Sequence, residues 1–112
     1  MIITEQVMLS ENRCGGKGTV EVHVLMEKVN LCDHGLGVTR IIIPPGASIG
    51  VHQHEKSVEQ YHVLTGSGIF HDNGTDKPIK AGETGVINPD EFHGIENTGD
   101  ENMEIIGVHM YE

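Results

Sequence analysis

Basic residues are scarce in this sequence of 112 residues, which has only 7 Lys and Arg against 17 Asp and Glu and a formal net charge of -10. A surface of this charge repels phosphate backbones and anionic lipids, so neither nucleic acid nor membrane is an expected partner. Apolar runs are short as well. None reaches the roughly 18 residues of a membrane-spanning helix, and Glu5 interrupts the apolar start that a signal peptide needs. We therefore expect a cytoplasmic protein.

Cysteine and aromatic residues are also few. Cys14 and Cys32 are too few for a disulfide framework and their spacing does not match a zinc ribbon, so we expect two free thiols. The chain has no Trp and only two Tyr and two Phe. A cavity in such a protein has little to stack on a polycyclic or sugar ligand, which favours a small, oxygen-rich, anionic molecule.

Glycine is abundant by contrast, with 15 residues, and it separates short segments rich in β-branched residues. These segments recur about every 8 to 12 residues, which is the spacing of a sandwich or a barrel. Asn73 and Gly74 are the strongest hairpin signal, because a type I′ turn needs positive φ at both central positions. The predicted strands cover residues 20–26, 38–43, 48–54, 60–64, 69–71, 75–79, 84–87, 92–95 and 104–110. We expect an all-β fold in a single domain, residues 1–112, with a loosely patterned segment 1–18 and a core 19–112.

Histidines and a glutamate follow one another at spacings that suit a metal site. His52 and His54 are one residue apart on a predicted strand, so both side chains point to the same face. In a chain with eight histidines about one half of such a pair is expected by chance, so the pair alone is weak support. Glu59 strengthens it, because the four intervening residues let the chain reverse and bring a carboxylate beside the imidazoles. His93 follows 34 residues later. Such a set suits a divalent transition metal and can leave coordination positions open.

The stretch from Gly46 to Gly66 resembles the first motif of the cupin superfamily: glycine, five residues, His, one residue, His, three or four residues, Glu, six residues, glycine. The second cupin motif is matched in its spacing by Gly82, His93 and Asn97. The resemblance covers about residues 38 to 110.

Two residues depart from the second motif: Asn88 and Asp90 stand where it has Pro and an internal Gly. Both departures are mild, because Asn and Asp tolerate positive φ better than other non-glycine residues. They put in doubt the local shape of the loop before His93, and not the histidine itself.

The resemblance implies a double-stranded β-helix, a jelly-roll-like cupin barrel of the small single-domain bacterial type. It implies that the metal ligands are His52, His54, Glu59 and His93. The metal would be one divalent ion, and the ligand chemistry permits Fe, Mn, Ni, Co or Zn without choosing among them. Cupins of this size commonly pair through their N-terminal strands, so the resemblance also implies a homodimer in which residues before Val20 cross over.

Three further residues are candidates for the pocket around the metal. Tyr61 shares the predicted inner face of its strand with Glu59, whereas His62 faces outward. His109 lies in the last predicted strand, where a satisfied barrel histidine is an equal alternative. Arg40 would hold a carboxylate or enolate if it faced inward. A surface arginine is an equal alternative, because apolar residues occupy both faces of its strand.

The function that these features favour is that of a metalloenzyme acting on a small, oxygen-rich substrate, with the metal as Lewis acid and template. Dioxygenase-like chemistry is our first expectation, by analogy with cupins, and decarboxylase or isomerase chemistry also occurs among them. A general base would come from Tyr61, His109 or a metal-bound hydroxide. The alternatives are a non-enzymatic protein that binds or senses a small molecule through its metal, and a metal-free structural barrel.

Overall fold

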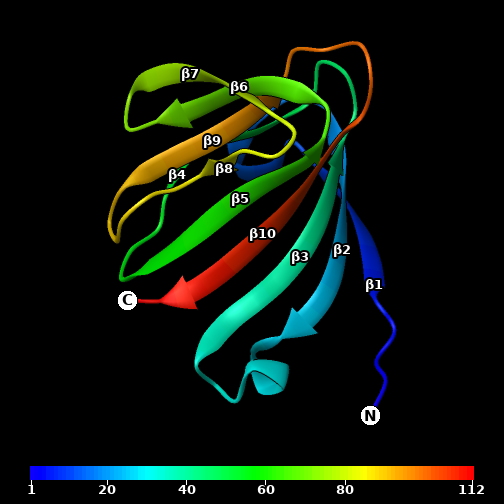
Figure 1. Cartoon of the computed structure of the whole chain (residues 1–112), viewed down its shortest axis with the longest axis vertical. Helices are drawn as coiled ribbons and strands as arrows, with labels where there is room; N and C mark the ends of the chain where they lie inside the picture. The colour runs from blue at the N-terminus through cyan, green and yellow to red at the C-terminus, as the bar shows by residue number, and fades with distance from the viewer.

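Ten β-strands and two short 3₁₀ turns make up the protein, whose computed structural model describes all of residues 1–112 (Figure 1). In chain order they are β1 (Gln6–Glu11), η1 (Arg13–Gly15), β2 (Thr19–Glu27), η2 (Lys28–Leu31), β3 (Gly35–Ile43), β4 (Ser48–Gln53), β5 (Ser57–Thr65), β6 (Ser67–Asp72), β7 (Thr75–Lys80), β8 (Thr84–Gly85), β9 (Phe92–Asn97) and β10 (Met103–Tyr111). Neither 3₁₀ turn is long and apolar enough to cross a membrane.

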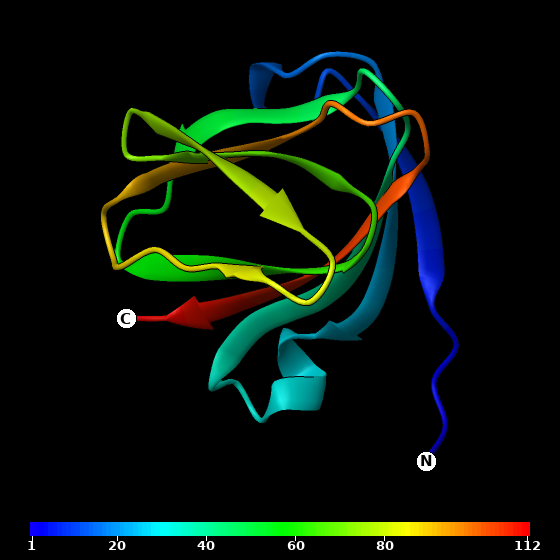
Figure 2. The same ribbon diagram turned by 45° about the horizontal axis from the view of Figure 1, so that its top comes forward.

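The strands form two antiparallel sheets. One sheet has six strands in the order β1-β2-β3-β10-β5-β8, and the other has four in the order β4-β9-β6-β7. In Figure 2 the sheets lie across from each other, with β4 and β9 on one side and β5 and β10 on the other. Strands that are distant in the sequence are therefore neighbours in space, as β3 and β10 are. The all-β fold expected from the sequence is confirmed.

An apolar layer fills the middle of the barrel. Ile105 of β10 lies opposite Ile41 of β3 and Val63 of β5 in the strand register. The facing sheet contributes Ile49 and Ile95, which lie opposite each other on β4 and β9. All five side chains are almost completely buried. Burial of this apolar surface is the main stabilising contribution to the fold. The layer also closes the barrel on one side of the residues that follow along the same strands.

The next residues along the same strands are polar. Two positions after Ile105, Gly107 lies opposite Thr39 and Tyr61, and two positions further on His109 lies opposite Glu59. Because side chains two apart on a strand share a face, these residues point into the barrel directly above the apolar layer. The register of the six-stranded sheet therefore builds a polar end of the barrel on an apolar base.

Every predicted strand coincides with a strand of the structure, with one shortened: β8 covers only Thr84–Gly85. The segment expected to be loosely patterned contains a further strand, β1, which pairs with β2. Its sequence hides the alternation because Val7, Met8 and Leu9 are all apolar, and in the structure all three are exposed. β1 is an edge strand with no apolar and polar face to distinguish.

Positive φ occurs at the turns where the sequence requires it. Asn73 and Gly74, between β6 and β7, have φ of 50° and 86°, as the predicted type I′ turn demands. Asp90, which replaces the glycine of the second motif, has φ of 68°. Gly66 has φ of 86°, and a Cβ there would lie 2.9 Å from the Met103 Cα. Asp tolerates positive φ better than most other non-glycine residues, which explains why Asp90 can take the place of the glycine of the second motif.

We predict that Asn97→Ala lowers the free energy of unfolding of the metal-free protein by about 3 kcal/mol. The Asn97 amide is buried, and its Nδ2 donates to the carbonyl oxygens of Ile43 (2.8 Å) and Glu101 (2.7 Å), while its Oδ1 accepts from the Gly99 amide (2.9 Å). Urea unfolding after chelation measures the change. Thr98→Ala, at an exposed neighbouring position, should leave the stability within about 0.5 kcal/mol. Equal stability of both variants would contradict the role given to the amide.

Candidate metal centre

A β-bulge in β4 aims the two histidines of the short pair into the barrel. Ile49 lies opposite Ile95, and His52 lies opposite His93, so three steps along β4 match two along β9. In a regular strand Ile49 and His52 would face opposite sides. The extra residue turns both inward, and His54, two positions further, follows His52.

The backbone of the bulge also orients the first imidazole. His52 Nδ1 lies 2.7 Å from the carbonyl oxygen of Gly50. Since a carbonyl only accepts, Nδ1 carries a proton, and in the neutral ring this tautomer leaves the lone pair on Nε2. That Nε2 lies 2.9 Å from Nε2 of His54. Two nitrogens bound at right angles to one ion, each about 2.1 Å from it, are about 3 Å apart. The spacing of the pair therefore fits a shared metal ion.

His93 on β9 is completely buried beside this pair. Its ring centroid lies 4.7 Å from that of His52 and 4.9 Å from that of His54, and it stacks on Tyr61 with centroids 4.4 Å apart and planes 12° from parallel. Both ring nitrogens of His93 are buried and have no hydrogen-bond partner. An unsatisfied buried polar atom costs about 1 to 3 kcal/mol, and a bound metal would satisfy one of them.

Glu59 approaches from the opposite sheet. It lies on β5, and its Oε1 is 3.7 Å from Nε2 of His54. Gly107 on β10 leaves room for this carboxylate, since a Cβ there would lie 2.9 Å from Thr39 Oγ1 and 3.4 Å from Glu59 Oε2. The donor atoms of His52, His54, Glu59 and His93 all lie within 4.8 Å of one another. The structure thus brings together all four residues that the sequence singled out, and the cluster can hold a metal.

Burial sets the protonation of the cluster. It lowers the pKa of His93 to about 3, with help from the neighbouring His52, His54 and His109. It also lowers the pKa of His54, although the carboxylate of Glu59 opposes the change. Both imidazoles are therefore neutral at pH 7, and a neutral imidazole has the lone pair that a metal binds.

Of the three further candidates, two lie beside the cluster. Tyr61 forms a wall against His93, and burial followed by the charge of Glu59 raises its pKa well above the ordinary value. The ring of His109 lies 4.8 Å from that of His54, and its Nε2 is 3.3 Å from Ser57 Oγ.

Arg40, the third pocket candidate, does not lie beside the cluster, and of the two positions that the sequence left open for it the structure has the outward one. Ile41 and Ile43 take the inner face of β3, so the arginine points outward. There its Nη1 donates to Glu104 Oε1 at 2.7 Å and its Nη2 to Glu5 Oε1 at 3.2 Å. The alternative of a surface arginine describes its position.

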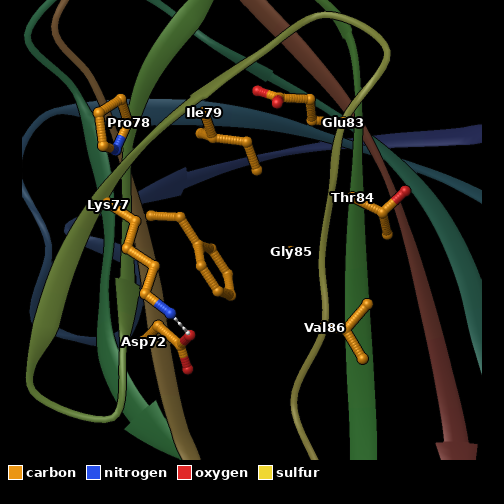
Figure 3. A pocket seen from close by; sticks show the side chains of 9 residues that line it. Asp72, Lys77, Pro78, Ile79, Glu83, Thr84, Gly85 and Val86 are labelled. Carbon is orange, nitrogen blue, oxygen red and sulfur yellow. Dashed lines mark hydrogen bonds and ion pairs between the residues drawn. The ribbon is translucent and has the colours of Figure 1, made fainter.

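A cleft with a volume of about 400 Å³ opens beside the cluster and is lined by Glu59 and His109, among others. A second pocket, of about 240 Å³, lies between β7 and β8, with Lys77 and Ile79 on one wall and Thr84 and Val86 on the other (Figure 3). None of the four metal-binding candidates lines the second pocket. Of these two cavities, only the first is lined by a member of the cluster, Glu59.

The chain is similar to known proteins in both sequence and structure. A family model described as a cupin domain matches residues 39–109, most of the chain. The chain belongs to the cupin family. The double-stranded β-helix implied by its motifs is confirmed, and this cupin carries its four donor residues within the matched range.

Relatives of this cupin are found among curated proteins and solved structures. An oxalate-binding protein of Thermotoga maritima is 44% identical over 97 residues, which span 87% of this chain and 80% of the relative. The crystal structure of a predicted oxalate decarboxylase from T. maritima has a TM-score of 0.91 at 41% identity, covering 98% of this chain and 94% of the other. An uncharacterized protein with a double-stranded β-helix domain from Klebsiella pneumoniae has a TM-score of 0.70 at 26% identity, covering 80% and 74%.

Two residues that shape the centre were not singled out for it from the sequence. Gly50 makes the bulge and orients His52, and a lone glycine inside a strand pattern is the signal that could have found it. Asp90 fastens the loop between His54 and Glu59: its amide donates to the His54 carbonyl oxygen (2.8 Å), and its Oδ1 accepts from the Lys56 amide (3.0 Å). No local sequence pattern predicts the contact between Asp90 and Lys56.

We predict that acid destabilises the metal-free protein through His93. Folding lowers the pKa of this imidazole from 6.5 to about 3, so below pH 6.5 the unfolded chain takes up the proton first. The free energy of unfolding should therefore fall from pH 6.5 towards pH 3, with His93 contributing at most about 1.4 kcal/mol per pH unit. Urea unfolding of chelator-treated protein at a series of pH values gives the slope.

Two variants test the assignment. His93→Gln should have a shallower slope than the unmodified protein, because it lacks the titrating ring. His34→Gln, at an exposed histidine, should keep the original slope. Identical slopes in all three proteins would show that His93 does not contribute to the acid sensitivity.

Proposed function

We propose that this cupin binds one divalent transition metal through His52, His54, Glu59 and His93 and holds a small carboxylate at that metal. The convergence of the four donor atoms within 4.8 Å, on an apolar base, carries the proposal. The metal, which is Fe, Mn, Ni, Co or Zn, would supply Lewis acidity and open coordination positions for substrate oxygens.

The relatives support oxalate as the first carboxylate to test. One is named an oxalate-binding protein and another a predicted oxalate decarboxylase, at 44% and 41% identity. These names favour decarboxylation, or binding alone, over the dioxygenase-like chemistry expected by analogy from the sequence. One assay distinguishes decarboxylation, dioxygenation and binding alone, because they differ in what becomes of oxalate and of oxygen.

Of the two candidate side chains beside the cluster, Tyr61 and His109, only one would transfer protons beside the carboxylate. The raised pKa of Tyr61 keeps its phenol protonated at pH 7, so it acts as a wall for His93 and not as a base. His109 lies beside His54 without being one of the four proposed ligands, and it lines the cleft. We assign proton transfer to His109 for this reason.

We predict that purified protein contains about one metal ion per chain and that it binds oxalate only when loaded. Elemental analysis gives the metal content, and calorimetry of the Mn, Fe, Co, Ni and Zn forms gives the affinity. Conversion of oxalate to formate and carbon dioxide would identify a decarboxylase. Oxygen uptake with both atoms of labelled O2 incorporated into the product would identify a dioxygenase, and saturable binding without product a binding protein.

The double variant His52→Ala, His54→Ala is the control for this experiment. It should lose the metal and the binding of oxalate together. The variant His71→Ala removes a histidine of β6 that is not one of the four donors and whose ring hydrogen-bonds with Asp76, and it should keep both. Equal metal content in all three proteins would refute the site and leave the metal-free structural barrel.

The homodimer implied by the cupin motifs is proposed on the exposed side of β1. Val7 and Leu9 on this edge strand are 53% and 71% exposed, and the unpaired backbone of the edge is free to pair. Apolar residues continue to the N-terminus, where Ile2 is 97% exposed. A second copy would cover this surface.

The cytoplasmic location stays a prediction.

We predict that light scattering gives the mass of a dimer, and that the double variant Val7→Lys, Leu9→Lys gives a monomer. The lysines place charge where the second copy would bury apolar surface. Val86→Lys, at an apolar residue 60% exposed just after β8, the opposite edge strand of this sheet, serves as a matched control and should stay dimeric. A monomeric unmodified protein would refute the proposed pairing.

A further inference from the structure

The turn before β2 is fastened to the strand that carries the histidine pair. The Lys17 amide donates to Ser48 Oγ, and the Ser48 amide donates to the Lys17 carbonyl oxygen, both at 2.9 Å. A Cβ on Gly16 would collide with the Ser48 carbonyl, and one on Gly50 would collide with the Cys14 carbonyl. The two backbones approach closely because glycine stands on both sides.

This contact brings Arg13, the first residue of η1, to the cleft beside the candidate metal centre. Arg13 lines the 400 Å³ cleft together with Glu59 and His109. Its side chain is half-buried and forms no ion pair, and its one hydrogen bond within the protein is a long one, from Nη1 to Ser10 Oγ at 3.4 Å. The guanidinium therefore has donors available to a ligand.

The other groups of the cleft leave this role to Arg13. Lys28 also lines it, but its Nζ lies over the Tyr111 ring, 5.3 Å from the centroid. Arg40 does not line the cleft, and it is paired with Glu104 on the outer face of the sheet. Thr39 adds a hydroxyl to the cleft lining whose oxygen is buried and has no hydrogen-bond partner.

The charge of Arg13 also acts on the interior of the barrel. Burial and the carboxylate of Glu59 raise the pKa of Tyr61, and the positive charge of Arg13 opposes that increase. An anion entering beside Glu59 meets a carboxylate in a protein of net charge -10, so a nearby cation is needed to offset the repulsion.

We propose that Arg13 is the anion-recognition residue of the metal centre. Its guanidinium binds a carboxylate of a small anionic ligand in the cleft while other ligand oxygens reach the four-residue cluster. The assignment rests on the proposed function, since it requires the metal-bound carboxylate. It identifies the ligand class as carboxylates with a second anionic group, and it makes Arg13 a positioning residue that is not a metal ligand.

Co(II)-loaded protein offers a direct test, because its visible spectrum reports ligands that reach the metal. Titration with oxalate and with imidazole, a neutral metal ligand, compares the two probes in one protein. Arg13→Gln should raise the Kd for oxalate about 10- to 100-fold and change that for imidazole less than about twofold. Cobalt content should stay at the level of the unmodified protein. Arg13→Lys should restore part of the affinity, since it keeps the charge without the planar fork.

Lys17→Gln removes a positive charge from the same turn at an exposed side chain and is the matched control. It should change neither affinity. An unchanged Kd for oxalate in Arg13→Gln, or an equal loss for imidazole, would overturn the assignment while leaving the proposed function in place. Failure of the unmodified cobalt protein to bind oxalate would overturn both, and loss of cobalt from Arg13→Gln would show a structural role instead.

Discussion

The register between β10 and its two neighbours is the constraint on which the candidate centre depends. It places Ile105 in a layer with Ile41 and Val63, and His109 in a layer with Glu59. A shift of one residue would turn every inward side chain of β10 outward. The apolar base and the polar layer above it would be lost together, so the same pairing that stabilises the barrel also positions the centre.

The apolar base matters for the chemistry as well as for stability. It buries His93 and keeps its imidazole neutral, which leaves a lone pair available without competition from protons at pH 7. A metal bound above such a base would be shielded on that side from water. Its interaction with a substrate oxygen would then be stronger than in bulk solvent, because the local dielectric constant is lower. The cleft beside Glu59 leaves the other side accessible.

Much of this arrangement could be predicted from the sequence because it depends on local rules. Alternation along a strand put His52 and His54 on one face, and it correctly separated buried Tyr61 from half-buried His62. The orientation of Arg40 could not be predicted, since apolar residues on both sides of its strand give alternation nothing to act on. β1 was missed for the same reason: its apolar residues are exposed on both faces, and pairing with β2 rather than burial defines it.

The role of Arg13 lies outside what motif matching can detect. The family model matches residues 39–109, a range that includes all four candidate ligands and begins well after the N-terminal turn. The proposed metal ligands thus belong to the barrel, while the cation in the cleft comes from a segment joined to it through Gly16 and Gly50. A change in that turn could alter which anion is held without disturbing the metal ligands. The proposed selectivity for the ligand and the proposed affinity for the metal would therefore depend on different segments of this protein.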